Sequence, residues 1–261
     1  MPSFIQYQVD AFADQPFSGN PAAVVLLTES LSDVQMQSIA NENNLSETAF
    51  VMAHESYYDL RWFTPTVEVD LCGHATLAAA HVLFHHQGID RDHVVFQTRS
   101  GELTVTRTAD GYCMDFPAQP PTPCWLPDAL LTEFAVEPVA VLAAVDYVVV
   151  LPDETHVRSY QPNLTVLASL PLRGVIVTAR STAYDFVSRF FAPNVGVAED
   201  PVTGSAHCQL APYWAEQLAK RELIAWQCST RGGEVVCRLD GDRVHLMGRA
   251  CTFLEGRIWL P

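Results

Sequence analysis

The chain repeats one sequence pattern in its two halves. Residues 61–75 read RWFTPTVEVDLCGHA, and residues 189–206 read RFFAPNVGVAEDPVTGSA. Aligned from the arginine, the two segments share a phenylalanine, a proline and two valines at matching positions. A three-residue insertion in the second segment then aligns Gly73 with Gly204 and Ala75 with Ala206. Such self-similarity is typical of a duplicated structural unit, so the repeat predicts two similar half-chains.

Each copy of the repeat runs into a helical pattern of small, apolar residues. HATLAAAHVLFHH follows Gly73, and SAHCQLAPYWAEQL follows Gly204. A helix that is apolar on all sides is a buried helix. Strand patterns dominate the remainder, for example at residues 21–27 and 173–180, whereas residues 32–43 favour a helix capped by Ser32. We therefore expect an α/β (α+β) fold in which each half is a sheet wrapped around one central helix.

A proline-rich stretch at residues 118–128 is the best candidate for a linker. It predicts an N-terminal half at residues 1–117 and a C-terminal half at residues 123–261. An alternative stays open, in which the last strand of the chain returns to the N-terminal half.

The composition excludes several classes of function. The 261 residues are 49% hydrophobic and 17% charged, which provides ample material for a core. The net charge is −15 and the few basic residues are scattered, so we expect no nucleic-acid partner and no binding to anionic membranes. An anionic substrate would have to be held by local dipoles rather than by the overall field.

Other features of the chain favour a cytoplasmic enzyme. The N-terminal residues MPSFIQYQVDAF lack the basic and apolar regions of a signal peptide, and no apolar run is long enough to span a bilayer. The seven cysteines form an odd count without a CxxC motif, which fits reduced thiols better than a disulfide framework. His81 and His85 have the spacing of a metal pair, but no third ligand accompanies them, and we predict no metal site.

The starts of the two buried helices are candidate binding sites. The first amide groups of a helix have no intrahelical partners and carry partial positive charge, so they attract anions. If the two halves are related by a pseudo-twofold axis, both helix starts face one cleft. Glu199 and Asp200 precede the second helix, where one of them could help to cap it.

Five segments together resemble the PhzF family of phenazine-biosynthesis isomerases. These segments are DAFADQPFSGNPAAVVLL, NLSETAFV, FTPTVEVDLCGHATLAAAHVLF, DFPAQPP and EDPVTGSAH. The resemblance covers nearly the whole chain and implies a duplicated diaminopimelate epimerase-like fold with two pseudo-symmetric domains. It also implies a homodimer, an active site between the halves, and neither metal nor cofactor.

The resemblance assigns roles to individual residues. The acid/base glutamate of the family falls on Glu47, its cleft histidine on His74, and its aspartate on Asp200. These three are the predicted catalytic residues. The predicted substrate-binding residues are Asn20, Gly73, Gly204 and Ser205. Simpler structural readings remain for several of them, because Ser205, His74 and Asp200 all stand where helix-capping residues are common.

The leading hypothesis is a cofactor-independent isomerase of a small carboxylate substrate, in which Glu47 removes a proton from one carbon and returns it to another. A second hypothesis is an epimerase or racemase of a small amino or hydroxy acid, with Cys72 and Asp200 as its two bases. Related epimerases use two cysteines, and the segment EDPVTGS has none, which disfavours the second hypothesis. A third is a non-catalytic small-molecule binder, which would exchange no proton with any ligand.

Overall fold

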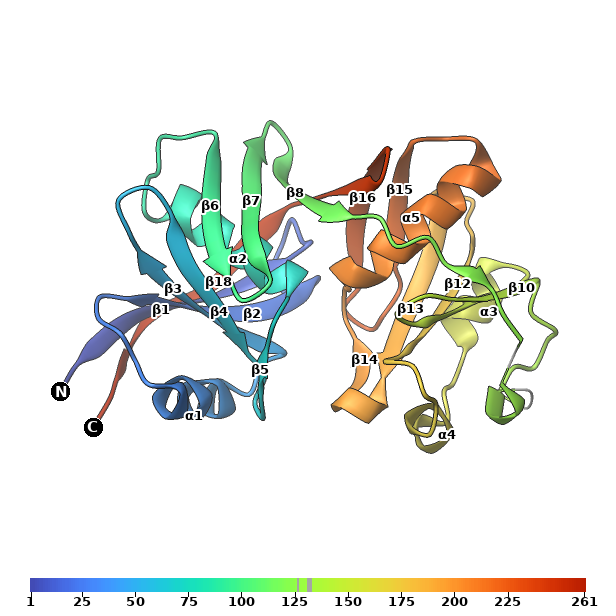
Figure 1. Ribbon diagram of the computed structural model, residues 1–261, viewed down its shortest axis with the longest axis horizontal. Helices are drawn as coiled ribbons and strands as arrows, with labels where there is room; N and C mark the ends of the chain where they lie inside the picture. Colours follow the sequence, from blue (N-terminus) through green and yellow to red (C-terminus); the bar gives the residue numbers. More distant parts are fainter. Residues whose placement is uncertain (126, 131–132) are drawn as a thin grey trace. The chain divides into compact units, whose positions relative to one another are not determined.

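The computed structural model describes residues 1–125, 127–130 and 133–261. The chain divides into two compact units, which Figure 1 labels by their helices and strands. Unit 1 contains Met1–Asp115 and Met247–Pro261, and unit 2 contains Phe116–Leu246. The proline-rich stretch lies at the start of unit 2, although its Leu126 is outside the described residues.

Unit 1 is built on a mixed sheet. Its main strands pair in the order β18, β1, β2, β3, β4, β6, β7 and β8, with β2–β3 and β4–β6 parallel and the other pairs antiparallel, while β5 also pairs with β4. The strands are β1 (Ser3–Ala11), β2 (Asn20–Leu27), β3 (Glu47–Ala53), β4 (Tyr58–Phe63), β5 (Glu68–Val69), β6 (His93–Thr98), β7 (Gly101–Thr108), β8 (Gly111–Pro117) and β18 (Ala250–Trp259). The end of the chain thus pairs with its beginning.

Helix α2 (Gly73–His85) forms the centre of unit 1. Every residue from position 74 to position 84 is buried, and the helix contacts strands β1, β2, β3, β7 and β18. Because the helix has no polar face, it is stable only where strands surround it. Helix α1 (Asp33–Asn43) packs outside, against β3 and β4, and the predicted cap at Ser32 is confirmed as a capping box with Gln35.

Unit 2 repeats the pairing pattern of unit 1. Strand β11 is parallel to β12, β12 is antiparallel to β13, and β13 is parallel to β15. The antiparallel pairs β9–β10, β10–β11, β13–β14 and β15–β16 complete the match. The strands are β9 (Thr122–Pro123), β10 (Ala140–Ala143), β11 (Tyr147–Val150), β12 (Val175–Arg180), β13 (Phe186–Ala192), β14 (Val197–Asp200), β15 (Glu222–Gln227), β16 (Gly233–Asp240) and β17 (Arg243–Gly248).

Helix α5 (Gly204–Leu218) is the counterpart of α2 in unit 2. It contacts β15 and β16, and its Trp214 stacks on Phe186 of β13 and donates a hydrogen bond from Nε1 to Thr178 of β12. Two short helices, α3 (Glu154–Ser159) and α4 (Leu164–Ala168), pack outside the sheet. The predicted fold, a duplicated sheet around a central helix, is confirmed in each unit. Within the described residues, no helix is both long and apolar enough to cross a membrane.

Helix α5 also contains a buried imidazole. His207 is fully buried, its Nδ1 lies 2.8 Å from the carbonyl oxygen of Thr203, and its Nε2 has no partner among the described residues. Burial disfavours the charged ring and lowers the pKa of His207 to about 4, even though the bond to Thr203 opposes this shift.

The buried His207 predicts a loss of stability in acid. The unfolded chain takes up a proton near the usual histidine pKa of about 6.5. The folded chain does so only near pH 4. The contribution of His207 to the free energy of unfolding is therefore fully present above pH 6.5 and is lost as the pH falls from 6.5 to about 4. The loss reaches at most about 3 kcal/mol for this group. Urea unfolding across this range should show a smaller decline for His207→Asn than for the wild type, and equal declines would contradict the prediction.

Candidate active site

The sheet of unit 1 brings two of the predicted site residues to one edge. Strands β2 and β3 are parallel neighbours, and Ala22 pairs with Glu47. Asn20 and Glu47 therefore stand at the same end of adjacent strands, each as the first residue of its strand. Helix α2 begins at Gly73, as predicted, and His74 in its first turn lies beside Asn20 and Glu47.

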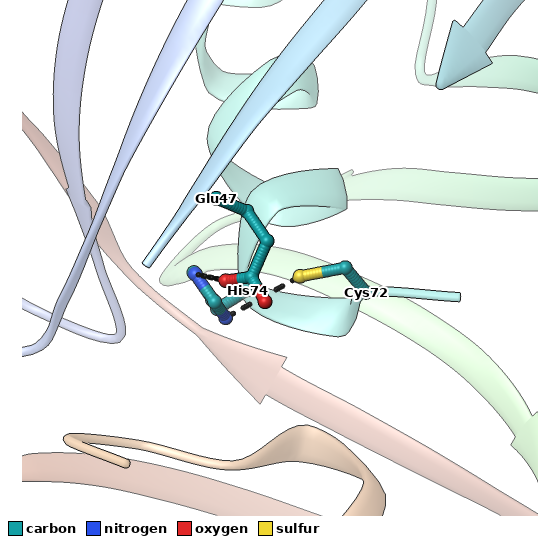
Figure 2. A group of neighbouring side chains, drawn as sticks. All are labelled: Glu47, Cys72 and His74. Atoms are coloured by element: carbon teal, nitrogen blue, oxygen red, sulfur yellow. Dashed lines mark hydrogen bonds and ion pairs between the residues drawn. The ribbon is translucent and has the colours of Figure 1, made fainter. Parts of the chain in front are cut away.

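His74 is the centre of this group, as Figure 2 shows. Its Nε2 lies 3.0 Å from Glu47 Oε2, and its Nδ1 lies 3.2 Å from Asn20 Nδ2. The thiol sulfur of Cys72, the residue before the helix, lies 3.5 Å from the same Nδ1. Because an amide nitrogen can only donate, the contact with Asn20 makes Nδ1 an acceptor and places the proton of the neutral ring on Nε2, facing Glu47.

The contact between Glu47 and His74 is close but poorly aligned. It meets the distance of an ion pair, yet neither Glu47 Oε2 nor His74 Nε2 has an aligned hydrogen-bond partner among the described residues. His74 is only 5% exposed, and the side chain of Glu47 is 15% exposed. Two desolvated polar atoms without aligned partners are costly to the fold and are available to a ligand.

The surroundings change the proton affinities of this group. Burial and, to a smaller extent, the nearby Glu47 carboxylate together raise the pKa of the Cys72 thiol to about 11. Burial disfavours the charged form of His74, but the contacts with Cys72 and Glu47 outweigh it and raise the pKa of His74. Since Cys72 is a neutral thiol near pH 7, Glu47 is the group that supports positive charge on the ring.

Unit 2 holds the other predicted residues at the start of α5. Asp200 ends strand β14, and Thr203 Oγ1 donates a hydrogen bond to its Oδ2. Gln227, fully buried on β15, accepts from the Thr203 amide at 2.8 Å and donates to the Asp200 carbonyl at 2.7 Å and to Thr203 Oγ1 at 3.1 Å. The buried side-chain amide of Gln227 therefore fixes the backbone between Asp200 and Thr203. The Thr203 hydroxyl in turn holds the Asp200 carboxylate.

Ser205 lies in the first turn of α5, beside a cation that sequence analysis missed. Arg173 Nη2 donates to Ser205 Oγ at 3.0 Å. The same guanidinium makes two bonds, of 2.9 and 2.6 Å, with the fully buried carboxylate of Asp146, which also accepts from Gln209. The Ser205 oxygen is thus an acceptor, so its hydroxyl proton is left to point elsewhere.

Three expectations about neighbouring residues need correction or comment. Glu199 does not help to cap α5, because Arg189 binds its carboxylate through two bonds of 2.7 and 3.0 Å. Ser205 is not the helix cap either, since Thr203 occupies that position without a capping side-chain bond. His81, which has the spacing of a metal pair with His85, lies 2.9 Å from the Tyr112 hydroxyl and 2.8 Å from that of Thr252.

Sequence analysis missed Arg173, Gln227 and Thr203. Arg173 and Gln227 lie outside the repeat in sequence. Arg173 precedes β12 and Gln227 ends β15, and both residues reach the start of α5 because both strands pair with β13. Thr203 had a usable signal, because it precedes Gly204 as Cys72 precedes Gly73. The structure brings Asn20, Glu47, Gly73 and His74 together in unit 1, and Asp200, Gly204 and Ser205 together in unit 2. That the two groups serve one substrate stays a prediction.

Known proteins share this architecture over nearly the full length of the chain. A crystal structure of a phenazine biosynthesis PhzF family protein from Enterococcus faecalis is 43% identical and superimposes with a TM-score of 0.97, covering 99% of this chain and 100% of that one. A hydroxyproline epimerase from Agrobacterium vitis, only 10% identical, superimposes with a TM-score of 0.63, covering 98% of this chain and 92% of that one. The fold is therefore that of the diaminopimelate epimerase-like proteins.

Sequence comparison gives the particular family. The family described as "Phenazine biosynthesis-like protein" matches residues 9–256. An uncharacterized isomerase from Pseudomonas aeruginosa is 54% identical over 254 residues, which cover 97% of this chain and 98% of that protein. The chain belongs to the PhzF family.

The bond from Thr203 to Asp200 predicts a difference between two substitutions. Thr203→Val keeps the shape of the side chain but removes the hydroxyl, which should lower the free energy of unfolding by roughly 1.5–3 kcal/mol, as expected for a hydrogen bond to a charged group. Thr203→Ser keeps the hydroxyl and should lose less. Urea unfolding at pH 7 measures both variants, and a valine variant at least as stable as the serine variant would refute the bond.

Proposed function

We propose that this protein is an isomerase of a small carboxylate substrate and that it needs no cofactor. In this proposal Glu47 transfers the proton, and His74 and Asp200 assist it. The relatives of this chain that are named isomerases support the reaction class. The contact between Glu47 Oε2 and His74 Nε2 supports the chemistry and is the single observation on which the proposal depends.

The surroundings of Glu47 suit a proton carrier. Its carboxylate is largely withdrawn from water and has a polar atom without an aligned partner. An isomerisation of this kind breaks one C–H bond and forms another, so the proton that Glu47 takes from the first carbon returns to the second. No oxidant or reductant is consumed, and the carboxylate is regenerated. In this proposal the nearby His74 ring, 3.0 Å from the carboxylate, stabilises its negative charge before and after the transfer.

Other residues are suited to hold an anion. The amide groups at the start of α2 and of α5 carry partial positive charge, which favours a carboxylate. The Ser205 hydroxyl is available as a donor, because Arg173 already donates to its oxygen. In this proposal a chain with a net charge of −15 attracts an acidic substrate because the helix starts are locally positive. The homodimer and cytoplasmic location remain parts of the proposal.

The epimerase hypothesis keeps one favourable observation, the position of the Cys72 thiol beside His74. Two observations weigh against it. The residue that occupies the matching position before α5 is Thr203, so the second thiol of related epimerases has no counterpart there and Asp200 would have to act as the second base. The raised pKa of Cys72 also keeps it protonated, although a thiol base acts as the thiolate.

Glu47→Gln should abolish proton exchange without unfolding the protein. The amide has nearly the same shape as the acid but cannot carry the proton, and loss of such a group typically costs 10²–10⁴-fold in rate, on the order of 3–5 kcal/mol. Incubation with small cyclic and linear carboxylates in heavy water, followed by mass spectrometry, measures the exchange without knowledge of the product.

A matched control separates this effect from general damage. Glu255→Gln changes a carboxylate of the same unit that is 61% exposed, and it should exchange at the wild-type rate. Circular dichroism and urea unfolding confirm that each variant is folded. If Glu47→Gln exchanged substrate protons nearly as fast as the wild type, Glu47 would not be the proton carrier.

Cys72→Ala distinguishes the isomerase from the epimerase. In the isomerase the thiol takes no part in the reaction, so its loss should reduce the rate only modestly, by less than about tenfold, which corresponds to about 1.4 kcal/mol. In a thiol epimerase the variant would be inactive. The same heavy-water assay on the folded variant decides between them.

A further inference from the structure

The proposed reaction leaves Cys72 without a task. The thiol is buried, and it lies at the start of α2 beside the two groups that carry the proposed chemistry. The ligand atoms of Glu47, Cys72 and His74 all lie within 4.8 Å of one another. Figure 2 shows the three side chains pointing toward one another from the start of β3 and the start of α2.

We propose that Glu47, Cys72 and His74 form a binding site for a divalent cation of the zinc type, and that an ion bound there inhibits the enzyme. Zinc prefers thiolate, imidazole and carboxylate ligands, and this site offers one of each. The inhibitory part of the proposal rests on the proposed function, because the bound ion would occupy the carboxylate that carries the proton.

The distances favour such a site. With Zn–S near 2.3 Å and Zn–N near 2.0 Å, tetrahedral ligands place sulfur and nitrogen about 3.5 Å apart. The Cys72 sulfur and His74 Nδ1 are 3.5 Å apart. The remaining adjustment falls on Glu47, the most exposed of the three side chains. An ion on Nδ1 displaces the hydrogen bond from Asn20, whereas Nε2–H continues to face Glu47.

The charges and the desolvation favour it as well. When the ion binds, the Cys72 S–H bond breaks, and where the His74 ring is protonated its Nδ1–H bond breaks too. These protons pass to the solvent, and the sulfur and Nδ1 coordinate the metal. One thiolate and one carboxylate then balance the two positive charges, so the buried site is electrically neutral. The Glu47 carboxylate, one of whose oxygens has no aligned partner in the folded chain, gains a positively charged partner. Three protein ligands leave a fourth position for water or for the substrate carboxylate.

Cobalt(II) tests the site without any substrate, because a Co(II)–thiolate bond gives a near-ultraviolet charge-transfer band and tetrahedral Co(II) gives intense visible bands. We expect the wild type to bind about one equivalent with both signals, and Zn²⁺ to displace it. Mg²⁺ and Ca²⁺, which prefer oxygen ligands, should not compete. Cys72→Ala should lose the thiolate band and bind more than about 100-fold more weakly, above the usual effect of second-shell losses.

Cys208→Ala is the matched control, since Cys208 is also buried near the start of a central helix but has no place in the cluster. It should bind cobalt like the wild type. Absence of the thiolate band in the wild type, or its persistence in Cys72→Ala, would overturn the site.

Inhibition has its own test, which uses the heavy-water assay with a substrate that the wild type exchanges. Zn²⁺ at one to two equivalents should stop exchange in the wild type and in Cys208→Ala, and should spare Cys72→Ala. Equal inhibition of Cys72→Ala would overturn the inhibitory role. If the wild type exchanged no substrate at all, the proposed function would fail, while the cobalt spectra would still decide the metal site.

Discussion

The burial of the central helix from residue 74 to residue 84 is the constraint on which unit 1 depends. Helix α2 has no polar face, so strands must surround it, and the sheet has to recruit strands from both ends of the chain to do so. A helix enclosed in this way still leaves its first amide groups without intrahelical partners. The enclosed helix therefore delivers a positive dipole end and a rigidly held residue, His74, to one edge of the sheet. In unit 2 the largely buried helix α5 has the same role, and Ser205 occupies the position that matches His74.

The two helix starts are equipped differently, although they come from one repeated pattern. In unit 1 the residues around the helix start can accept and release protons, with Glu47 next to His74 and a thiol beside them. In unit 2 the neighbouring groups are fixed by buried and partly buried hydrogen bonds, from Gln227 through Thr203 to Asp200 and from Asp146 through Arg173 to Ser205. This difference favours a single proton carrier in unit 1 over a symmetric pair of bases.

Sequence analysis predicted much of the candidate site because the informative residues lie next to the repeat. His74 and Ser205 each follow the glycine that begins a helix, and the five resembling segments assigned roles to Glu47 and Asp200. Arg173, Asp146 and Gln227 escaped prediction because nothing near them in sequence marks them. A lone arginine before a strand or a glutamine at the end of one has many ordinary uses. Only the pairing of strands distant in sequence brings them to the start of α5.

The amino-acid sequence by itself determined the duplication, the two buried helices and their glycine starts, because apolar periodicity and the repeat are properties of local sequence. Tertiary structure decided the rest. The pairing of β18 with β1 joins segments about as far apart as the chain allows, and no local pattern specifies such a pairing. Glu199 pairs with Arg189 instead of capping α5, because the pairing of β13 with β14 brings the guanidinium to its carboxylate. The contact between Glu47 and His74 likewise arises because parallel pairing aligns the starts of β2 and β3 beside the first turn of α2, and this geometry exists only in the folded chain.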